Sequence, residues 1–316
     1  MNRHYIKHLL AFVICSVFGC SSTLAQDASD TAEKQTVVLP PLFEFPVAPE
    51  ELGWTESSNW LTQHFWDPFD FKVQSVGQQQ LNHAFETWII PIRYSSPEVT
   101  DKAVDALLKK IEKNPTLLLQ FTRAAERSIY DPDTAQIWND DMYLKFINAI
   151  LKNKKVSSAY KAKYSRQKQL LENTKVSKPF MKFDYVARTG EKKKFDANGR
   201  YAIIEFGDPS CPNCQMARIS LVTDDYIKAN RDNIDIYFII PELEEGDISW
   251  TQEVMDYPDG WKVGAAELDD LLDIRTSPSF FLVDPSGNLL LKNVNLSTVT
   301  RYLQDNTSGN GAQKDE

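Results

Sequence analysis

The segment that decides the fold is YAIIEFGDPSCPNC, residues 201–214. Its first six residues form a nearly continuous apolar run, which is typical of a central strand covered on both faces. Cys211 and Cys214 follow after a short loop, at the start of a stretch, residues 211–230, that has a helical pattern. The segment therefore predicts a strand, a loop and a helix in succession, with a pair of cysteines where the helix begins.

The position and spacing of this pair are suited to thiol chemistry. A helix N-terminus provides about half a positive charge and unpaired backbone N–H donors, and both stabilise a thiolate. We therefore expect Cys211 to be the attacking thiol, with a lowered pKa, and Cys214, one turn later, to be the resolving thiol. Pro212 fits the first turn because a proline there sacrifices no hydrogen bond.

Two other uses of the cysteine pair remain to be weighed. A zinc site needs about four ligands, and beyond Cys20 the remaining candidates are His64 and His83, which lie far upstream without paired spacing. A purely structural disulfide across so short a loop would gain little from loop closure. Neither a metal nor a small-molecule cofactor is expected.

The pattern changes from helical to strand-like near residue 178. Residues 284–288 contain Asp, Pro, Ser, Gly and Asn, and indicate a hairpin turn. Within the expected helix at 211–230, Met216, Ile219, Val222 and Tyr226 share one side. The succession of elements predicts an α/β domain, a mixed sheet with flanking helices on both faces. The expected strands are 183–187, 201–206, 234–240, 280–283 and 289–291. The expected helices are 211–230, one between the strands at 234–240 and 280–283, and 294–304.

Residues 178–306 resemble the thioredoxin-like superfamily, in particular the extracytoplasmic thiol–disulfide oxidoreductases of the TlpA/ResA type. The resemblance rests on the strand and CPNC motif at 203–214, on TSP at 276–278 followed by FFLVD, and on PSGN at 285–288. It implies a cis peptide bond between Ser277 and Pro278 that packs against the cysteines. It also implies that the Ser277 backbone offers hydrogen bonds to an extended substrate peptide.

Glu205 stands where thioredoxins often place a buried acid. The resemblance implies a carboxyl of raised pKa that exchanges a proton with Cys214. The alternative is that Glu205 points to a sheet edge or pairs with a lysine such as Lys194. The chain departs from the family pattern at Ser210, because an aromatic residue usually precedes the first cysteine.

The resemblance implies a thiol–disulfide oxidoreductase that acts on protein thiols and disulfides of the cell envelope. Another dithiol protein would donate or accept electrons, and the motif does not fix their direction. One alternative is a thiol peroxidase, although the Thr needed three residues before the attacking cysteine is replaced by Asp208. A second alternative is a binding or scaffold module that senses redox state.

Residues 50–177 predict an all-α domain. Ser96, Asn114 and Asn139 are expected N-caps, the first two followed by proline, and a further helix is expected at 157–173. Aromatic residues between Trp54 and Phe71 are expected to fill the helical core. The region looks like an N-terminal domain of unknown function that precedes this fold in bacterial envelope proteins.

The N-terminus predicts export. Two basic residues precede an apolar run at 9–19, which is typical of a signal peptide over 1–25 and too short to span a bilayer. Cleavage after Ala25 is favoured, while a lipobox-like pattern would instead make Cys20 a lipid anchor. We expect a periplasmic or envelope-anchored protein without a transmembrane helix, with a Pro-rich linker at 26–49 and a disordered tail at 307–316.

The overall composition is that of a folded, acidic protein. The 316 residues are enough for about two domains. The chain has 35 Lys and Arg against 44 Asp and Glu, a net charge of −9. Sequence-independent nucleic-acid binding depends on basic residues that neutralise phosphates, so a nucleic-acid partner is not expected.

Overall fold

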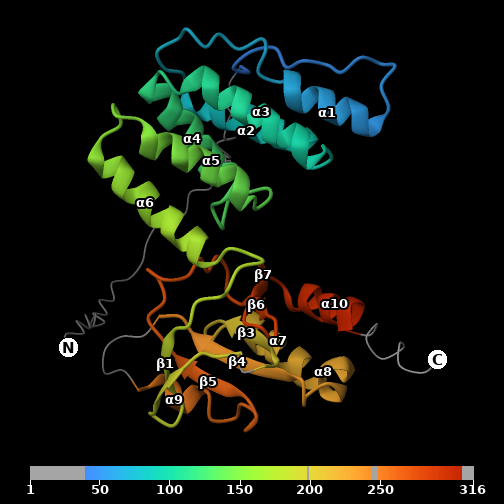
Figure 1. Ribbon diagram of the computed structural model, residues 1–316, viewed down its shortest axis with the longest axis vertical. Helices are drawn as coiled ribbons and strands as arrows, with labels where there is room; N and C mark the ends of the chain where they lie inside the picture. Colours follow the sequence, from blue (N-terminus) through green and yellow to red (C-terminus); the bar gives the residue numbers. More distant parts are fainter. Residues whose placement is uncertain (1–39, 198, 243–247, 308–316) are drawn as a thin grey trace, which may run out of the picture. The chain divides into compact units, whose positions relative to one another are not determined.

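The apolar run at 201–206 forms the strand β3 (Tyr201–Phe206) in the computed structural model, which describes residues 40–197, 199–242 and 248–307. It pairs in parallel with β4 (Ile234–Ile240) and antiparallel with β6 (Ser279–Val283). Having a neighbour on each side makes β3 central, which is the position that its apolar run predicts. Figure 1 shows the sheet and labels β1, β3, β4, β5, β6 and β7.

The sheet is mixed, as expected, and has seven strands in the order β2-β1-β5-β4-β3-β6-β7. Its parallel pairs are β3 with β4 and β4 with β5, and the other pairs are antiparallel. Two of its strands were not predicted, since β2 consists of three exposed lysines and β5 is a short segment that contains a glycine. The remaining strands are β1 (Asp184–Ala187), β2 (Lys192–Lys194), β5 (Lys262–Ala265) and β7 (Leu289–Val294).

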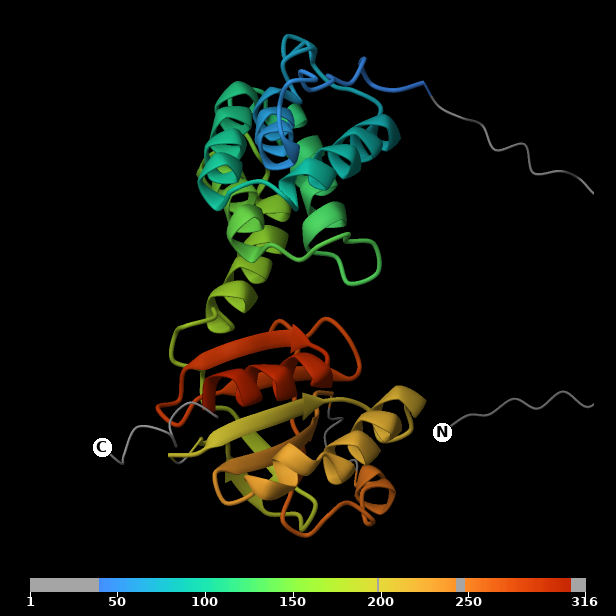
Figure 2. The same cartoon turned by 90° about the vertical axis from the view of Figure 1, so that its right-hand side faces the viewer.

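The helices of this domain cover one face of the sheet, not two. Side chains of α7 (Pro212–Thr223), α8 (Asp225–Ala229) and α10 (Leu296–Thr307) share a core with Ile203 of β3, and Figure 2 shows these helices together on the sheet. The short helix α9 (Trp250–Glu253) packs over Phe238, on the same face. The expectation of helices on both faces is therefore wrong. Among the described residues, the opposite face is covered by non-helical segments that carry Phe180, Phe183, Phe195, Leu268 and Leu272.

The helix predicted at 211–230 is divided in two. It is interrupted at Asp224, whose carboxylate accepts a hydrogen bond from the Ile227 backbone N–H at 2.9 Å and so caps α8. The predicted apolar side of this helix faces outward, with Met216 62% exposed and Ile219 52% exposed. Cys214 and Leu221 face inward instead. The last helix also differs from its prediction, because β7 continues to Val294 and displaces the start of α10 to Leu296.

The first part of the described chain is helical, as predicted. Ser96, Asn114 and Asn139 are N-caps whose side chains accept backbone hydrogen bonds. The two helices before Ser96 were not individually predicted, and the second contains Pro91. The helices are α1 (Trp54–His64), α2 (Gln78–Ile92), α3 (Pro97–Ile111), α4 (Pro115–Ile129), α5 (Asp140–Lys152) and α6 (Ser158–Asn173).

Aromatic side chains fill the core of this helical region. Trp66 lies at its centre, with its ring centroid 5.0 Å from that of Phe121 and 5.7 Å from that of Trp88. The expectation of an aromatic core is confirmed, although Trp54 is exposed. Within the expected linker, Leu42, Phe43 and Phe45 also pack against this core. No helix in the described part of the chain is long and apolar enough to cross a membrane.

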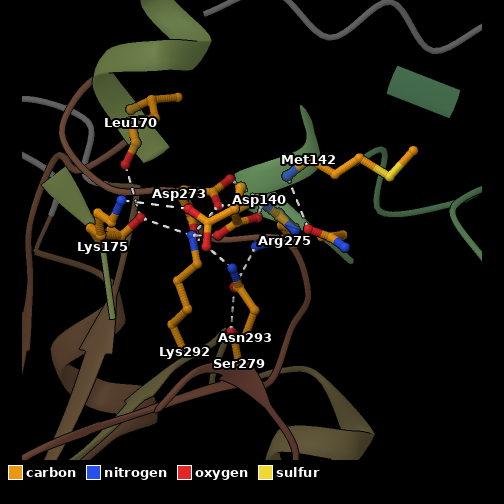
Figure 3. A network of polar contacts seen from close by, with 12 residues as sticks. Asp140, Met142, Leu170, Lys175, Asp273, Arg275, Ser279, Lys292 and Asn293 are labelled. Atoms are coloured by element: carbon orange, nitrogen blue, oxygen red, sulfur yellow. Dashed lines mark hydrogen bonds and ion pairs between the residues drawn. The ribbon is translucent and has the colours of Figure 1, made fainter. Parts of the chain in front are cut away.

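A buried polar network connects the helical region with the sheet domain (Figure 3). The described residues belong to one compact unit of the chain. Asp140, in the first turn of α5, lies 2.6 Å from both Arg275 Nη2 and Lys292 Nζ. The same two cations contact Asp273 at 2.7 and 2.8 Å. Burial opposes ionisation of Asp140, but the two cations outweigh it and hold the pKa of its carboxyl below the ordinary value.

Several predicted segments lie outside the described residues. They are the signal peptide with Ala25 and Cys20, the part of the linker before residue 40, and the tail from residue 308.

Candidate redox site

Cys211 is the N-cap of α7, as the sequence predicts, and its side chain is partly exposed. The backbone N–H of Cys214 makes the largest contribution to lowering the pKa of the Cys211 thiol, and the N–H of Asn213 and the side chains of Cys214 and Ser277 contribute too. Burial opposes this shift but does not outweigh these hydrogen bonds. Cys211 therefore has the reactive form and the access that a nucleophilic thiol needs.

Cys214 differs from Cys211 in both burial and pKa. It is fully buried, and burial raises the pKa of its thiol to about 11. A Cβ atom on Gly207 would lie only 2.8 Å from Cys214 Sγ, so the glycine leaves the space that this sulfur occupies. Gly207 was not predicted as a site residue. Its position directly after an apolar strand and before the motif was the available signal.

Ser277 and Pro278 lie beside both cysteines. Their peptide bond is cis, as the family resemblance implies. The Cys211 thiol approaches the Ser277 carbonyl oxygen at 3.9 Å, and Cys214 Sγ lies 3.3 Å from Ser277 Oγ. Ser277 is exposed to solvent. One exposed residue thus contacts both sulfurs, and the contact through its hydroxyl group was not expected.

Glu205 is fully buried, and neither of its carboxylate oxygens has a hydrogen-bond partner among the described residues. Burial raises its pKa to about 8; Arg218 opposes the shift and Cys211 adds to it. The alternative of an edge position or a lysine partner is wrong, because β3 is central and Lys194 lies near Asp184.

Glu205 lies on the same side of the sheet as the cysteines. Alternate residues of an extended strand face the same side, and the backbone remains extended through Gly207, whose N–H donates to the Ile239 carbonyl at 3.2 Å. Since Cys214 Sγ lies over Gly207, the carboxyl of Glu205 is directed to the space beneath the resolving thiol.

Two further residues line this space and were missed by the sequence analysis. The guanidinium carbon of Arg218 lies 4.4 Å from the ring centroid of Tyr257. Burial raises the pKa of Tyr257 to about 12, and the charges of Glu205 and Cys214 also act on it. Arg218 was detectable because it lies four residues after Cys214, on the same helix face. No local pattern marks Tyr257.

Asp208 shapes the loop before the cysteines. Its carboxylate accepts hydrogen bonds at 2.7 Å from both the backbone N–H and the hydroxyl group of Ser210. Its carbonyl oxygen accepts the Cys211 N–H at 3.1 Å. The residue at the peroxidase threonine position thus has a structural role in this loop.

The histidines considered as metal ligands lie in the helical region. His64 Nδ1 is 2.8 Å from an Asp67 carboxylate oxygen, and the His83 ring packs near Phe45. In the described ranges, no group of three or more His, Cys, Asp or Glu side chains is arranged to hold a metal ion.

The chain was compared with families, curated proteins and solved structures. Residues 19–174 match the family model of a domain of unknown function, DUF5106. No curated protein matches the sequence. Among solved structures, the chain is similar to a thioredoxin-like protein from Bacteroides caccae, with 17% identity and a TM-score of 0.70, over 85% of this chain and all of that one. A thiol-disulfide oxidoreductase from Bacteroides fragilis aligns at 20% identity over 40% of this chain and 98% of its own, with a TM-score of 0.35.

The Bacteroides caccae likeness covers more of the chain than the sheet domain alone, so it extends into the helical region. At this level of identity it shows the fold. The chain therefore has a thioredoxin-like fold that carries the Cys211–Cys214 pair, preceded by a helical region that matches a domain family of unknown function.

Proposed function

We propose that the protein is a thiol–disulfide oxidoreductase that exchanges disulfides with protein partners through Cys211 and Cys214. The observation that carries this proposal is the contrast between the two thiols. Cys211 is accessible and has a lowered pKa, whereas Cys214 is buried and has a raised pKa. A two-step exchange reaction needs this asymmetry. One thiol must be reactive and accessible to attack the partner's disulfide, and the other must stay protonated until it resolves the mixed disulfide.

In the reducing direction, the Cys211 thiolate attacks a disulfide of the partner. A mixed disulfide forms, and the partner's other sulfur leaves as a thiolate. Cys214 then loses its proton and attacks Cys211 Sγ, which releases the partner's second sulfur and closes the Cys211–Cys214 disulfide. Two electrons have passed to the partner, and another dithiol protein must return them. The oxidising direction reverses these steps.

Glu205 would serve this reaction as the group that exchanges the Cys214 proton. A carboxyl with a pKa of about 8 gains and loses its proton near neutral pH. Ser277 and Pro278 would hold the partner, since Ser277 is exposed and its backbone would hydrogen-bond to an extended chain next to the attacked sulfur. The Ser277 hydroxyl group would stabilise the Cys214 thiolate as it forms.

The proposed location follows from the N-terminal sequence. We infer export through the signal peptide at 1–25, with cleavage after Ala25 or lipidation of Cys20. The partners would then be thiol and disulfide proteins of the cell envelope. Disulfide exchange is suited to such a compartment, where disulfides form and persist.

The test is to trap the mixed disulfide. A Cys214→Ser variant, incubated with a disulfide-bonded protein such as insulin, should accumulate a covalent complex through Cys211, detected by mass spectrometry. The matched Cys211→Ser variant should accumulate none, because the remaining thiol is buried. Alkylation of Cys211 in the wild type should also be fast at neutral pH, and a slow reaction together with no trapped complex would contradict the proposal.

A peroxide-consumption assay completes the test. Consumption of peroxide without reduction of insulin would favour the peroxidase alternative, and neither activity would favour a redox-sensing binding module.

A further inference from the structure

A groove of about 400 Å³ begins at Ser277, next to the two cysteines, and extends to the helical region. Its wall on the helical side includes Tyr130, Pro132 and Leu170, and its opposite wall includes Leu272 and Ile274. The groove is thus continuous with the place where a partner disulfide must lie when Cys211 attacks it. A partner chain that leaves this place on the Ser277 side enters the groove.

The wall from the helical region is attached to the buried polar network. The guanidinium carbon of Arg275 lies 4.5 Å from the ring centroid of Tyr130. The Leu170 carbonyl accepts the Thr174 hydroxyl group at 2.8 Å, and Lys292 Nζ lies 3.1 Å from the same hydroxyl oxygen.

The same network also holds the chain that enters the substrate loop. Arg275, two residues before Ser277, is bound by both Asp140 and Asp273 (Figure 3). Its backbone N–H donates to the Asn293 side chain at 3.0 Å. The helical wall and the loop at Ser277 are therefore held by one set of contacts, so that the groove between them has a defined shape.

The chemistry of the groove is apolar with a negative rim. Leu170, Leu272 and Ile274 contribute apolar surface, and Glu242 and Asp269 are exposed acids at its border. Within the described ranges, neither of these two acidic side chains forms an ion pair. The nearby cations do not offset them. Asp140 and Asp273 neutralise Arg275, and Arg166, which donates to the Asp269 carbonyl at 3.4 Å, is paired with Asp270.

We propose that this groove binds an extended segment of the partner protein beside the attacked cysteine, with a basic side chain facing Glu242 and Asp269 and an apolar one against Leu170. This inference rests on the proposed function and deepens it. The Ser277 backbone would pair with the segment at one end, and the helical region would select its side chains farther along. The helical region thus becomes part of the substrate site.

The experiment uses the full-length protein with its cysteines reduced beforehand, so that the protein supplies both electrons in a single turnover. Two disulfide-bonded peptides are compared. One has Lys next to the disulfide and the other has Glu at the same position. Both have a leucine after this position and are otherwise identical. The wild type should reduce the Lys peptide about fivefold faster than the Glu peptide. The variant E242K/D269K should lose or reverse this preference.

Three controls make the result specific. The variant E51K/D305K changes the charge equally at two exposed sites outside the groove and should keep the preference. Leu170→Ala should slow both peptides by about threefold through lost apolar contact. Hydroxyethyl disulfide, which is small and neutral, should react equally with all variants.

The groove proposal would be overturned if the wild type reduced the two peptides at equal rates, or if E242K/D269K kept the preference for the Lys peptide. The proposed function would still stand in that case, provided that the protein reduced hydroxyethyl disulfide. A wild type that reduces neither the peptides nor the small disulfide would overturn the proposed function, and the groove proposal with it.

Discussion

Two buried acids in this protein have opposite surroundings. The side chain of Asp273 is 3% exposed and contacts the cations of Arg275 and Lys292. Glu205 is also buried, on the central strand, and its oxygens have no hydrogen-bond partner among the described residues. Two cations thus compensate the charge of Asp273. A charge on Glu205, in contrast, would receive no hydrogen bond from the described residues.

A buried carboxyl group can therefore have either of two roles, depending on its neighbours. A buried carboxylate that contacts two cations holds distant segments together, but losing one partner leaves charge uncompensated. A buried carboxyl without such partners keeps its proton to higher pH. Glu205 has a pKa of about 8 and can therefore exchange a proton near neutral pH. We associate the first arrangement with positioning and the second with proton movement.

Both acids lie close to the cysteine pair, on different segments. Asp273 accepts a hydrogen bond from Arg275, in the segment that leads to Ser277. Glu205 lies beneath Cys214, on the strand that leads to Gly207. The comparison therefore predicts that changes at Asp273 affect mainly stability, whereas changes at Glu205 affect mainly the resolving step.

The largest effect is expected from Asp273→Asn. The substitution leaves Arg275 and Lys292 buried with only Asp140 to compensate them, so the free energy of unfolding should fall by about 3–5 kcal/mol. Denaturant titration followed by circular dichroism measures this change. Asp133→Asn removes the same charge at an exposed position and should have little effect. A loss as small as that of the control would show that the network does not stabilise the fold, and the contrast with Glu205 would disappear.

Local sequence signals were sufficient for much of the fold. The side chains of Ser96, Asn114 and Asn139 cap helices through hydrogen bonds to residues two or three positions away, so the cap and its helix are visible together in the sequence. The central strands were equally visible because they are buried along their length. The strand β2 was missed because three lysines at a sheet edge carry no apolar signal.

The prediction of helices on the second face of the sheet was wrong for a different reason. That face is covered by loops and by side chains such as Phe180 and Leu272, and their positions depend on tertiary packing. The position of Met216 on the outside of α7 is a similar case. Apolar residues lie on more than one side of this helix, and periodicity alone does not tell which side meets the sheet.

Part of the candidate site could also be predicted from the sequence. The spacing of Cys211 and Cys214 indicated their chemistry, and the resemblance placed Glu205, Ser277 and Pro278 beside them. The contact between Asp140 and Arg275 joins residues far apart in the chain, and nothing in either segment indicates the other. Whether Glu205 had a partner could likewise be learned only from the packed structure.

A smaller effect, confined to one kinetic step, is expected from Glu205→Gln. The amide cannot exchange the Cys214 proton, so resolution of the mixed disulfide should slow by about 100-fold. Stopped-flow mixing of a preformed mixed disulfide measures this rate. Alkylation of Cys211 should change by less than about twofold, since Glu205 is mostly neutral at neutral pH. Glu267→Gln, at an exposed position, serves as the control. Equal slowing of both reactions would point to a distorted site and would contradict the specific role.

The smallest effect is expected in the free energy of unfolding, when it is compared between pH values one unit apart. The ordinary pKa of 4.5 applies to Glu205 in the unfolded chain, and the folded protein retains the proton up to about pH 8. Between these values the folded state binds more protons, so this group's contribution to stability decreases as the pH rises, by at most about 1.4 kcal/mol per pH unit. Below the lower value the contribution is fully present.

Comparing the wild type with Glu205→Gln isolates this contribution, because the glutamine does not titrate while all other groups remain. The free energy of unfolding, measured in denaturant at about pH 6 and about pH 7, should fall more in the wild type than in the variant. Parallel curves would mean that Glu205 ionises in the folded protein as it does in the unfolded chain. Its surroundings would then compensate its charge as Arg275 and Lys292 compensate that of Asp273, and Glu205 would have no special ability to carry the Cys214 proton.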